Sequence, residues 1–549
     1  EAVLKEVGVS YEILPGQLSH IPESGGFITV SNHHFGSIDG LILSSVIGGK
    51  RSDYRILTTF LLALIPSLRS SFMPVDNLSG SKASAKSVQG IRMALQHIND
   101  GGALGFFPAG EVATYQKGSR RTAIGKKKII EDKPWAENII KLIKKSGFPV
   151  VPVYFEGTNS RFFHFLGKIH PRLRTLRLIH EMMNKEGTHV KVRIGQAISP
   201  EEIAAYSVAE LGKYLRNRTY ALAAECVEKK TGTGSSVFST PVAEPGDPQV
   251  IASEMEAAAD RILFEYGDYR AYLTGAERIP NAMRELYRLR EETFRAVGEG
   301  TGKPLDTDSF DPYYQHLILW NIPNGEIVGS YRIGVGKEAY DNHGGISAFY
   351  TSTLFKYNEN SKETLRNSME LGRTIVQKKY QRDIQSLRLL LTGLAASTLR
   401  FPQQKYFLGP VSISNDVPPF YQSLIVWFLE NKASSQQTKA LASPTNAFRP
   451  DYLAVDPAAL LSRIETIDAL DKLLATISDG RYRVPVLVKK YFNFGAKLVC
   501  FNVDPDFNNS LDGLILLPLK GFPKEHLKTL IKVLPAEQQE MILCDSPLS

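Results

Sequence analysis

The stretch GGFITVSNHHFGSIDG at residues 25–40 passes from a short apolar run into the start of a helical pattern. Gly26 to Val30 is predicted as a strand and Ile38 to Ile47 as a helix, so the polar residues between them form a loop at a strand end. The same alternation recurs downstream, with a helix predicted at Ser84 to Ile98 and strands at Ala103 to Phe107 and Val150 to Phe155. Strands that alternate with helices indicate an α/β sheet covered on both faces.

Two residues at this strand end suit acid–base chemistry, His34 and Asp39. Ser37 is the expected helix N-cap, and it places Asp39 in the first turn, where free backbone N–H groups favour a carboxylate. Asp39 can then accept a hydrogen bond from one ring nitrogen of His34, leaving the other nitrogen to take a proton from a hydroxyl. Such a pair without a serine suits acyl transfer from a thioester, because the substrate hydroxyl is the nucleophile. The alternative is an ordinary loop histidine beside a capping aspartate.

Three further blocks strengthen the acyl-transfer interpretation. FMPVDN occupies residues 72–77, GFFPAGE residues 105–111 and VVPVYFEG residues 150–157. In this order, after the His-x4-Asp box of His34 and Asp39, the blocks resemble those of the glycerophosphate/lysophosphatidate acyltransferase family. The resemblance covers roughly residues 15–225, and it implies His34 as general base and Asp39 as its orienting partner.

The resemblance also implies an acceptor site around the first and third blocks, formed by Asn32, Phe107, Pro108, Gly110 and Glu111. The third block departs from the family, because Ala109 stands where the family has Glu and no Arg follows the Gly at the usual place. Glu111 can substitute in part. Since that block helps the family to hold a phosphate-bearing acceptor, we expect an acceptor here that has a hydroxyl and no phosphate.

Charge is unevenly distributed over the 549 residues. The net charge of +8 divides into +11 for residues 1–240 and −3 for residues 241–549, and residues 117–193 carry 18 basic and 6 acidic side chains. Such a block either solvates helix faces or meets an anionic partner. We favour an anionic membrane surface, with an acidic carrier protein as the alternative; nucleic acid is not expected, since no recognition helix or stacking motif accompanies the charge. The residues concerned are Lys126, Lys127, Lys128, Arg172, Arg174 and Arg177, with FFHFL at 162–166 as an interfacial wedge or a core segment.

Cysteine content and hydropathy bear on the location of the protein. Cys226, Cys500 and Cys544 stand far apart without a CxxC motif or a histidine cluster, so neither a disulfide scaffold nor a metal site is expected. The longest apolar run, Ile56 to Leu68, is shorter than the about 20 residues that span a bilayer. We expect a cytoplasmic protein held peripherally at the inner face of the cell membrane. No signal peptide is visible, although the sequence begins with Glu1, so a leader or anchor can be missing.

A change of composition separates two domains. Residues 231–250 are rich in Thr, Gly, Ser and Pro, which is typical of a linker. We therefore predict one domain at 1–230 and a second, independent α/β domain at 251–549. The elements predicted in the second domain are helices at Val250 to Phe264, Arg366 to Lys379 and Ile384 to Thr398, and strands at Gln315 to Leu319 and Ile327 to Val335.

Charged residues of the second half stand at suggestive spacings. Glu370 and Arg373 are three residues apart and share a face of the helix predicted there. Arg332 lies in an apolar strand, and a buried guanidinium needs a partner, for which Glu370 is the obvious candidate. Ordinary surface salt bridges are the alternative.

These positions form the pattern Arg-x3-Phe, Asp-x2-Asp, a strand Arg and Glu-x2-Arg, which resembles the acyl-homoserine-lactone synthase branch of the GNAT superfamily. The pattern is closer still to the ornithine-lipid N-acyltransferases, often labelled hemolysin-like, which also carry segments like LGPVS at 408–412 and PVLVKKY at 485–491. The resemblance covers roughly residues 265–520 and implies Glu370 as the base that helps to deprotonate the amine. The implied substrate-binding residues are Arg290, Phe294, Glu299, Asp308, Asp311, Arg332, Arg373 and Ser412.

The acyl donor is indicated by a motif that the second half lacks. GNAT enzymes hold coenzyme A with a Gln/Arg-x-x-Gly-x-Gly/Ala loop, and no such loop is visible. We expect no bound cofactor and an acyl carrier protein thioester as donor, as the family implies, with acyl-CoA as the alternative. Lys378, Lys379, Arg382 and Arg388 can meet the acidic carrier, or they can solvate a helix face.

Together the halves resemble the bifunctional ornithine-lipid synthases. The implied chemistry is transfer of a 3-hydroxyacyl group to the α-amine of an amino acid by the second domain, then acylation of the 3-hydroxyl by the first. Ornithine is the family default, and a lysine or glycine lipid is equally compatible with the residues. Three rivals stay open: a glycerophospholipid acyltransferase with an accessory GNAT-like domain, a synthase of a diffusible N-acyl signal, and a non-enzymatic membrane-binding protein of the hemolysin-like kind.

Overall fold

The computed structural model describes residues 2–58, 71–74, 85–115, 120–122, 125–127, 130–227, 240–544 and 548. The chain forms two compact units, Glu1–Lys229 with Arg449–Arg483, and Lys230–Phe448 with Val484–Ser549. Several features predicted from the sequence fall outside the described residues: most of the apolar run 56–68, the end of the second block at 75–77, and the first part of the linker at 231–239. Within the described residues, no helix combines the length and the apolar character that crossing a membrane requires.

The first unit is built on a seven-stranded sheet in which only β10 and β11 run antiparallel. Its order across the sheet is β1 (Ser10–Ile13), β11 (His189–Ile194), β10 (Val150–Phe155), β2 (Phe27–Ser31), β5 (Ala103–Phe106), β3 (Arg55–Thr58) and β4 (Phe72–Pro74). β2, β5 and β10 are buried along their whole length, and their sequences are mostly apolar, with Thr29 and Ser31 as the polar residues of β2. The predicted α/β sheet is confirmed.

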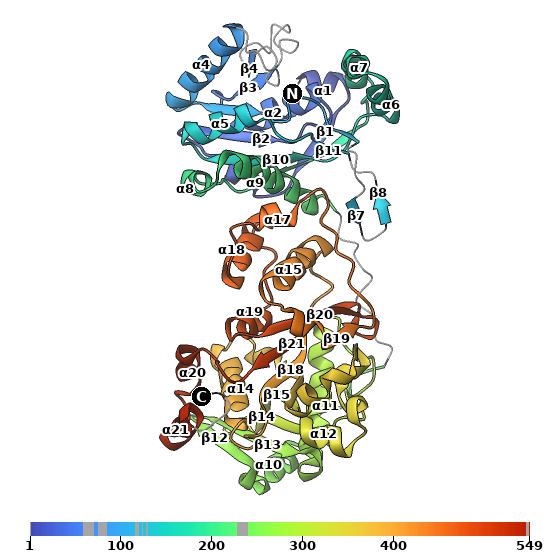
Figure 1. Ribbon diagram of the computed structural model, residues 1–549, viewed down its shortest axis with the longest axis vertical. Coiled ribbons are helices and arrows are strands. Elements are labelled where there is room, and N and C mark those ends of the chain that lie inside the picture. Colours follow the sequence, from blue (N-terminus) through green and yellow to red (C-terminus); the bar gives the residue numbers. More distant parts are fainter. Residues whose placement is uncertain are drawn as a thin grey trace. The chain divides into compact units, whose positions relative to one another are not determined.

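Helices cover both faces of this sheet (Figure 1). The described helices of this unit are α1 (Ala2–Glu6), α2 (Ser37–Lys50), α4 (Ala85–Asn99), α5 (Glu137–Ser146), α6 (Arg161–Ile169), α7 (Pro171–Met183), α8 (Pro200–Ala204), α9 (Val208–Ala221), α17 (Pro457–Leu460) and α18 (Ile467–Ile477). α2 packs against β3 and α7, whereas α9 packs against β2 and β10. The apolar side of α2 joins β2, β5 and β10 in one core, so the β2–α2 loop is held between packed elements.

Residues 449–483 belong to the first unit, although the sequence predicts an unbroken second domain over 251–549. α17 packs on α9, and the backbone N–H of Asp456 donates to the side-chain oxygen of Asn217 at 2.7 Å. Arg481 forms an ion pair with Glu225, whose side chain is 2% exposed. Composition alone does not reveal such a return of the chain, because an amphipathic helix shows that it has a partner without showing which one.

The second unit is built on an eight-stranded sheet in which only β17 and β18 run parallel. Its order is β12 (Ile262–Tyr266), β13 (Tyr269–Gly275), β14 (Gln315–Asn321), β15 (Glu326–Val335), β17 (Ser368–Val376), β18 (Tyr406–Ile413), β21 (Ser510–Pro518) and β20 (Lys497–Asp504). A short pair, β16 (Phe355–Tyr357) and β19 (Ala442–Pro444), forms a separate two-stranded sheet that packs against β20. The helices are α10 (Pro248–Ala257), α11 (Pro280–Ala296), α12 (Gly336–Asn342), α13 (Lys362–Arg366), α14 (Ile384–Ser397), α15 (Pro419–Lys432), α16 (Gln436–Lys439), α19 (Val486–Asn493), α20 (Lys524–Ile531) and α21 (Ala536–Cys544).

Two predicted helices of this unit are wrong in whole or in part. The helix predicted over 366–379 is mostly the central strand β17, whose first four residues are all buried between β15 and β18. Tertiary burial overrides local helix propensity at such a position. The helix predicted over 250–264 ends at Ala257, and its last part is the strand β12.

β17 and β18 pair only at one end. Their register joins Ser368, Met369 and Glu370 to three residues of β18, from Tyr406 to Leu408. Beyond that point β18 contains Pro410, which has no N–H to donate to a ladder. On β17, two residues lie opposite one residue of β15 at Arg373, whose φ of 47° marks a bulge. The two strands therefore part in the middle of the sheet.

Candidate active sites

The loop between β2 and α2 is closed by Asp39. One carboxylate oxygen, Oδ2, accepts from the backbone N–H of Phe35 at 2.9 Å and of Gly36 at 3.0 Å. Gly36 is the N-cap of α2, so the prediction that Ser37 caps the helix is wrong by one residue. Gly36 has φ 91°, a conformation that glycine adopts without strain, and it turns the chain sharply before the helix.

The same oxygen of Asp39 binds His33 rather than His34. His33 Nδ1 lies 3.0 Å from Asp39 Oδ2, and the His33 side chain is 18% exposed. The predicted contact between Asp39 and His34 is therefore wrong, because the turn at Gly36 brings the earlier histidine back over the carboxylate. With Nδ1–H donating to Asp39, Nε2 of His33 is left with its lone pair and can accept a proton.

His34 lies in a buried aromatic pocket. Its ring is 5.8 Å from that of Tyr154 and 6.2 Å from that of Tyr220, and only 4% of the residue is exposed. Neither ring nitrogen makes a hydrogen bond of normal geometry to the described residues. Burial lowers the pKa of His34, against the opposing charges of Asp132 and Asp39. His34 is thus a neutral core side chain in this structure.

The backbone of the loop is fixed from several sides. Asn32 forms a reciprocal pair with Phe155 of β10, donating to its carbonyl at 3.0 Å and accepting from its N–H at 2.8 Å. The N–H of His33 donates to Asp132 at 3.1 Å, and the carbonyl of His33 accepts from Ala113 at 2.7 Å. Asn32, predicted to bind acceptor, therefore holds β10 to the loop that carries His33.

The third block lies beside His33. The Phe107 ring stacks on the His33 ring with 4.2 Å between centroids. Gly110, with φ 68°, closes a turn by donating to the Phe107 carbonyl at 3.0 Å, and the Pro108 carbonyl accepts from Ala136 at 2.8 Å. The block thus orients the imidazole by packing, and the conformation it needs explains a glycine at 110.

Glu111 of the same block is engaged by two cations. Lys133 Nζ lies 2.5 Å from its carboxylate and Arg174 Nη2 lies 2.6 Å away. Burial acts to raise the pKa of Glu111, but the hydrogen bonds from Lys133 and Arg174 outweigh it and lower the pKa. Glu111 is therefore ionised and tied to α7, and it does not stand free to bind an acceptor.

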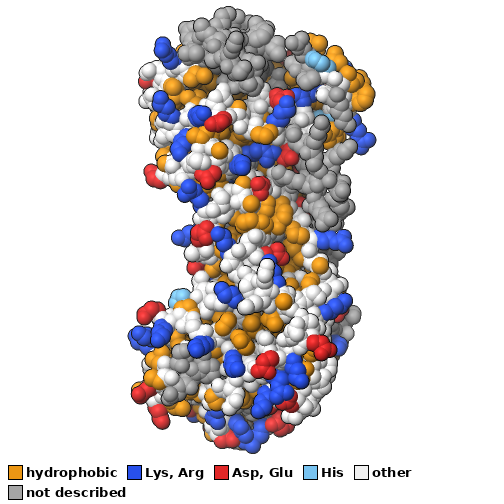
Figure 2. All heavy atoms as spheres, viewed as in Figure 1, with side chains coloured by type: hydrophobic (Ala, Val, Ile, Leu, Met, Phe, Trp, Pro, Cys, Tyr) orange, Lys and Arg blue, Asp and Glu red, His pale blue; other side chains and the backbone are white. Residues whose placement is uncertain are grey.

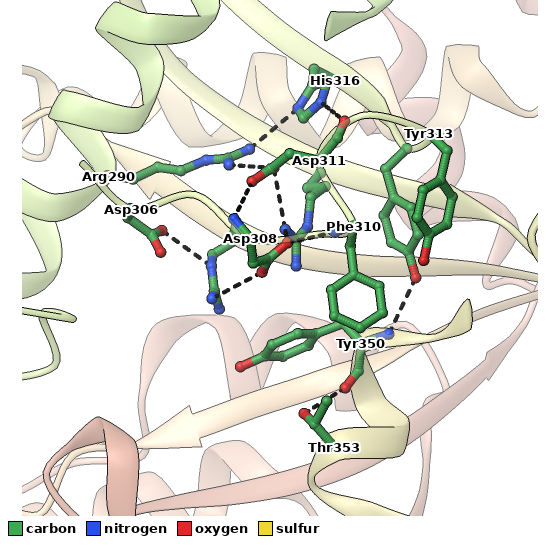
Figure 3. A network of polar contacts seen from close by, with 12 residues as sticks. Arg290, Asp306, Asp308, Phe310, Asp311, Tyr313, His316, Tyr350 and Thr353 are labelled. Carbon is green, nitrogen blue, oxygen red and sulfur yellow. Dashed lines mark hydrogen bonds and ion pairs between the residues drawn. The ribbon is translucent and has the colours of Figure 1, made fainter. Parts of the chain in front are cut away.

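In the second unit, three arginines predicted from the sequence meet three aspartates in one buried network (Figure 3). Arg290 of α11 contacts Asp311 at 2.8 Å, and Arg332 of β15 contacts Asp308 at 2.6 Å and Asp311 at 3.2 Å. Arg373 contacts Asp306 at 3.1 Å and Asp308 at 3.3 Å. Burial acts to raise the pKa of Asp311, but Arg290 and Arg332 hold it well below its usual range.

Arg332 therefore pairs with aspartates, and the prediction of Glu370 as its partner is wrong. Glu370 faces a different group of residues, because it lies on a strand and not on the predicted helix. Its two oxygens accept from the backbone N–H groups of Tyr350 at 2.9 Å and Thr351 at 2.8 Å, and from the hydroxyls of Tyr314 and Thr351. Burial raises the pKa of Glu370, and these hydrogen bonds oppose the rise.

His316 completes the network and was missed in the sequence. Its Nε2 lies 3.0 Å from the Asp311 carbonyl, and its Nδ1 lies 3.2 Å from Arg290 Nη2. Because a guanidinium only donates, Nδ1 accepts and the proton is on Nε2. Burial, with a further contribution from Arg290, lowers the pKa of His316 to about 3. A histidine within the apolar strand QHLILW was the available signal.

A cavity of about 560 Å³ opens where β17 and β18 part. Its walls include α11, the bulged half of β17, β18, α19, and the ends of β20 and β21. Of the residues predicted to bind substrate, Phe294, Glu299, Arg373 and Ser412 line it. Arg290, Asp308, Asp311, Arg332 and Glu370 are absent from its lining, and the first four form the ion-pair network that supports Arg373.

Three carboxylates line this cavity: Glu299, Asp504 and Asp512. Burial raises the pKa of Glu299 to about 7, and the charges of Asp512, Asp416 and Asp504 add to the rise. Burial likewise raises the pKa of Asp512 to about 7, with Asp504 adding to the rise and hydrogen bonds from Ser412 and Ser510 opposing it. Carboxylates with pKa values near 7 are matched to proton transfer at neutral pH.

Asp504 and Asp512 were missed in the sequence. Asp512 stands inside the buried run SLDGLILLP, so a charged residue in an apolar strand was again the signal. Its register position opposite Ser412 of β18 brings it to the cavity. Arg373 supplies the positive charge, with its guanidinium 4.7 Å from the Tyr350 ring centre and 5.1 Å from that of Phe507. A guanidinium and three carboxylates in the described lining of one cavity suit a zwitterionic ligand.

Comparison with known proteins indicates acyl transfer for both parts of the chain. A family model described as acyltransferase matches residues 1–227, and a model described as acetyltransferase (GNAT) domain matches residues 289–391. The protein is thus an acyltransferase enzyme with two acyltransferase-type domains, as the sequence predicts.

Proteins of similar sequence narrow the class of acyltransferase. Glycine N(alpha)-acyltransferase of Bacteroides thetaiotaomicron is 27% identical over 311 residues, which are 54% of this chain and 91% of that protein. The protein of the same name from Phocaeicola vulgatus is 32% identical over 236 residues, 40% of this chain and 71% of that protein. The chain belongs to the glycine N(alpha)-acyltransferase family. It is also similar to the lyso-glycine lipid O-acyltransferase of P. vulgatus, at 29% identity over 189 residues, 33% of this chain and 62% of that protein.

Two solved structures are similar to parts of the chain. The 1-acyl-sn-glycerophosphate acyltransferase of Thermotoga maritima has 17% identity and a TM-score of 0.23, covering 39% of this chain and 74% of its own. A CoA-dependent acyl-homoserine lactone synthase has 12% identity and a TM-score of 0.17, covering 28% of this chain and 70% of its own.

Proposed function

We propose that this chain makes a two-chain amino-acid lipid by two successive acylations. The second unit N-acylates an amino acid with a 3-hydroxyacyl group, and the first unit O-acylates the 3-hydroxyl of that product. The observation that carries the proposal is the presence of two separate proton-accepting sites in one chain: the His33–Asp39 pair at 3.0 Å, and the carboxylate-lined cavity of about 560 Å³. The names of the relatives favour glycine as the amino acid, in place of ornithine.

In the N-acylation step, the amino acid binds in the cavity with its carboxylate toward Arg373 and its ammonium toward Glu299 and Asp512. A carboxylate with a pKa near 7 accepts one proton from the ammonium. The free amine then attacks the thioester carbonyl, the C–N bond forms, and the C–S bond breaks to release the donor thiol. We assign the base to Glu299 or Asp512 in place of Glu370, because both Glu370 oxygens are already held by Tyr314, Tyr350 and Thr351.

In the O-acylation step, Nε2 of His33 takes the proton of the acceptor hydroxyl while Asp39 accepts from Nδ1–H. The oxygen attacks the second thioester, and the imidazolium returns its proton to the departing thiolate. Glu111 pairs with both Lys133 and Arg174, and this supports an acceptor without a phosphate, since both cations are already engaged by a carboxylate. His33 replaces His34 in this assignment.

The acyl donor and the location of the protein are part of the same proposal. We propose acyl carrier protein as donor, because the second half lacks the loop with which GNAT enzymes hold coenzyme A, and acyl-CoA as the competing donor. We also propose peripheral attachment at the inner face of the cell membrane, where a one-chain lipid acceptor would lie. Turnover of purified protein with acyl carrier protein thioester and with acyl-CoA, at equal concentrations, distinguishes the two donors.

Expression in a host without amino-acid lipids tests the function. With labelled glycine or ornithine in the medium, we expect mass spectrometry to find a two-chain glycine lipid. His33→Ala should leave the one-chain form, because N-acylation does not need His33. Phosphatidate as the product would instead support a glycerophospholipid acyltransferase, a secreted one-chain product would support a signal synthase, and labelled ornithine lipid would overturn the choice of glycine.

A further inference from the structure

The outward faces of α6 and α7 carry a concentration of exposed apolar side chains, which Figure 2 shows over the right-hand edge of the first unit. Seven large side chains on these two helices are between 42% and 76% exposed: Phe162, Phe165, Ile169, Leu173, Leu176, Ile179 and Met183. Successive members on each helix are three or four residues apart, so each helix presents a continuous apolar stripe. A contiguous patch of this kind marks an interaction surface.

The opposite side of the two-helix segment is anchored to the unit. Phe163 is fully buried, and the Arg174 guanidinium lies 5.8 Å from its ring centre. The buried carboxylate of Glu181 accepts from the Ser160 hydroxyl at 2.6 Å and its N–H at 3.0 Å, which joins the start of α6 to the end of α7. The stripes are therefore held outward by a fixed inner face.

The charge of the segment selects one kind of partner. Residues 161–183 contain five Lys or Arg and one acidic residue, and that residue is the buried Glu181. The Arg177 guanidinium lies 4.6 Å from the ring centre of exposed Phe162, so positive charge borders the apolar stripe. An apolar face bordered by cations suits an anionic bilayer, where the rings enter the headgroup region and the cations meet lipid phosphates.

The same segment contacts the histidine loop directly. Asn159, one residue before the N-cap Ser160, donates to the carbonyls of His34 and Phe35 at 3.3 Å each. Arg174 of α7 holds Glu111 of the third block at 2.6 Å. A surface at α6 and α7 is therefore continuous with the elements that carry His33 and Phe107.

We propose that the apolar stripes of α6 and α7 are the surface by which this chain docks on an anionic lipid bilayer, at the side where the acceptor lipid reaches His33. The proposal rests on the O-acylation of a lipid proposed above, and it names the element that meets the membrane. A second copy of the chain and an acyl carrier protein are the other occupants that the experiment separates from a bilayer.

Vesicle sedimentation of the full chain tests the docking surface without any acyl transfer. We expect binding to vesicles of phosphatidylglycerol and phosphatidylcholine, and weaker binding to phosphatidylcholine alone. Phe165→Asp should weaken binding about tenfold, since it places a charge on the apolar face. Met93→Asp on α4 is the matched control, because Met93 is 55% exposed and Phe165 is 53% exposed; it should bind as the unsubstituted chain does.

A second pair of variants reports contact with lipid directly. Trp emission in Phe165→Trp should be quenched by brominated phosphatidylglycerol, and emission in Met93→Trp should not. Failure of the chain to bind anionic vesicles, or equal binding by both aspartate variants, would overturn the proposal. The proposal would also be overturned if Phe165→Asp bound vesicles normally but lost a dimer, which would make the surface a contact between copies of the chain. The same holds if Phe165→Asp bound vesicles normally but lost binding to acyl carrier protein. Vesicle binding through this surface without O-acylation would instead refute the proposed function and leave the surface standing.

Discussion

At the scale of single residues, Asp39 connects the backbone of the β2–α2 loop to the imidazole of His33. Its Oδ2 receives two backbone N–H groups and His33 Nδ1 within 3.0 Å, so loop closure and imidazole orientation depend on one oxygen. The side chain is fully buried, and Phe107 holds the other face of the ring. This arrangement fixes the tautomer that a general base needs.

Asp39→Asn tests that arrangement. The amide oxygen can still accept from the loop backbone, but it no longer carries the charge that stabilises an imidazolium. We expect O-acylation to fall by about 10²–10⁴-fold, the usual contribution of general-base catalysis. N-acylation should not change. Initial rates with a one-chain N-acyl amino acid as acceptor measure the first effect, and an unchanged O-acylation rate would remove Asp39 from the mechanism.

Glu299 gives a prediction about pH. Its pKa is raised to about 7, so it is protonated below pH 7 and can accept a proton only above it. N-acylation should therefore rise between pH 6 and pH 8, and Glu299→Gln should lower it at pH 8 by at least about 10²-fold. A pH profile of kcat/KM measures this, and a flat profile would contradict the assignment.

The stability of the second unit should fall as the pH rises, over the range in which N-acylation increases. A folded-state pKa above the unfolded value of 4.5 means that the stabilisation from protonated Glu299 is complete below about pH 4.5 and is lost as the pH rises through 7. The glutamine in Glu299→Gln does not ionise, so this variant does not lose stability as the pH rises through 7. We expect the variant to unfold at a higher temperature than the unsubstituted chain at pH 8, and the difference to shrink toward pH 5.

At the scale of elements, the parting of β17 and β18 makes the cavity of the second unit. Gly409 is the residue that allows the two strands to approach before they part, since a Cβ there would lie 2.3 Å from the Leu371 carbonyl oxygen. Pro410 and the bulge at Arg373 then separate them. Gly409 thus allows backbone contact between the strands at one end, whereas Pro410 and the bulge at Arg373 open the cavity at the other.

Gly409→Ala should force these strands apart. We expect a loss of stability of about 1–3 kcal/mol, as for other overpacking substitutions, and a matching loss of N-acylation. Gly372→Ala is the control for stability, because no heavy atom lies within 4 Å of its added Cβ. Thermal unfolding compares the two, and equal midpoints would show that the close approach at Gly409 is not required.

Some of these elements and site residues can be predicted from the sequence, and others cannot. Apolar runs such as Val150–Phe155 are unambiguous because burial on both faces leaves no polar position. Segment 366–379 is not, since its residues fit a helix locally and only the neighbouring strands decide. His33 was missed because it stands six positions before Asp39, and the contact depends on the turn at Gly36. Asp512 could have been predicted, because it is a charged residue inside an apolar strand, as Arg332 is.

At the scale of the whole molecule, the described residues of the two candidate sites belong to different units. His33, Asp39 and Phe107 belong to the first unit, and the walls of the carboxylate-lined cavity belong to the second. The composition anticipates this division through the linker and the charge contrast between the halves, although it does not anticipate residues 449–483 in the first unit. The two acylations should therefore fail independently.

Side-by-side rates of the two acylations in purified full-length variants test that division most directly. His33→Ala should lose O-acylation by at least about 10²-fold with N-acylation intact, and Glu299→Gln should show the reverse. His34→Ala, which empties an aromatic pocket, should lower stability and leave most of the O-acylation. Two independent sites with His33 as the base predict these three results. Loss of both reactions in His33→Ala would contradict independent sites. An O-acylation loss in His34→Ala as large as in His33→Ala would contradict the choice of His33.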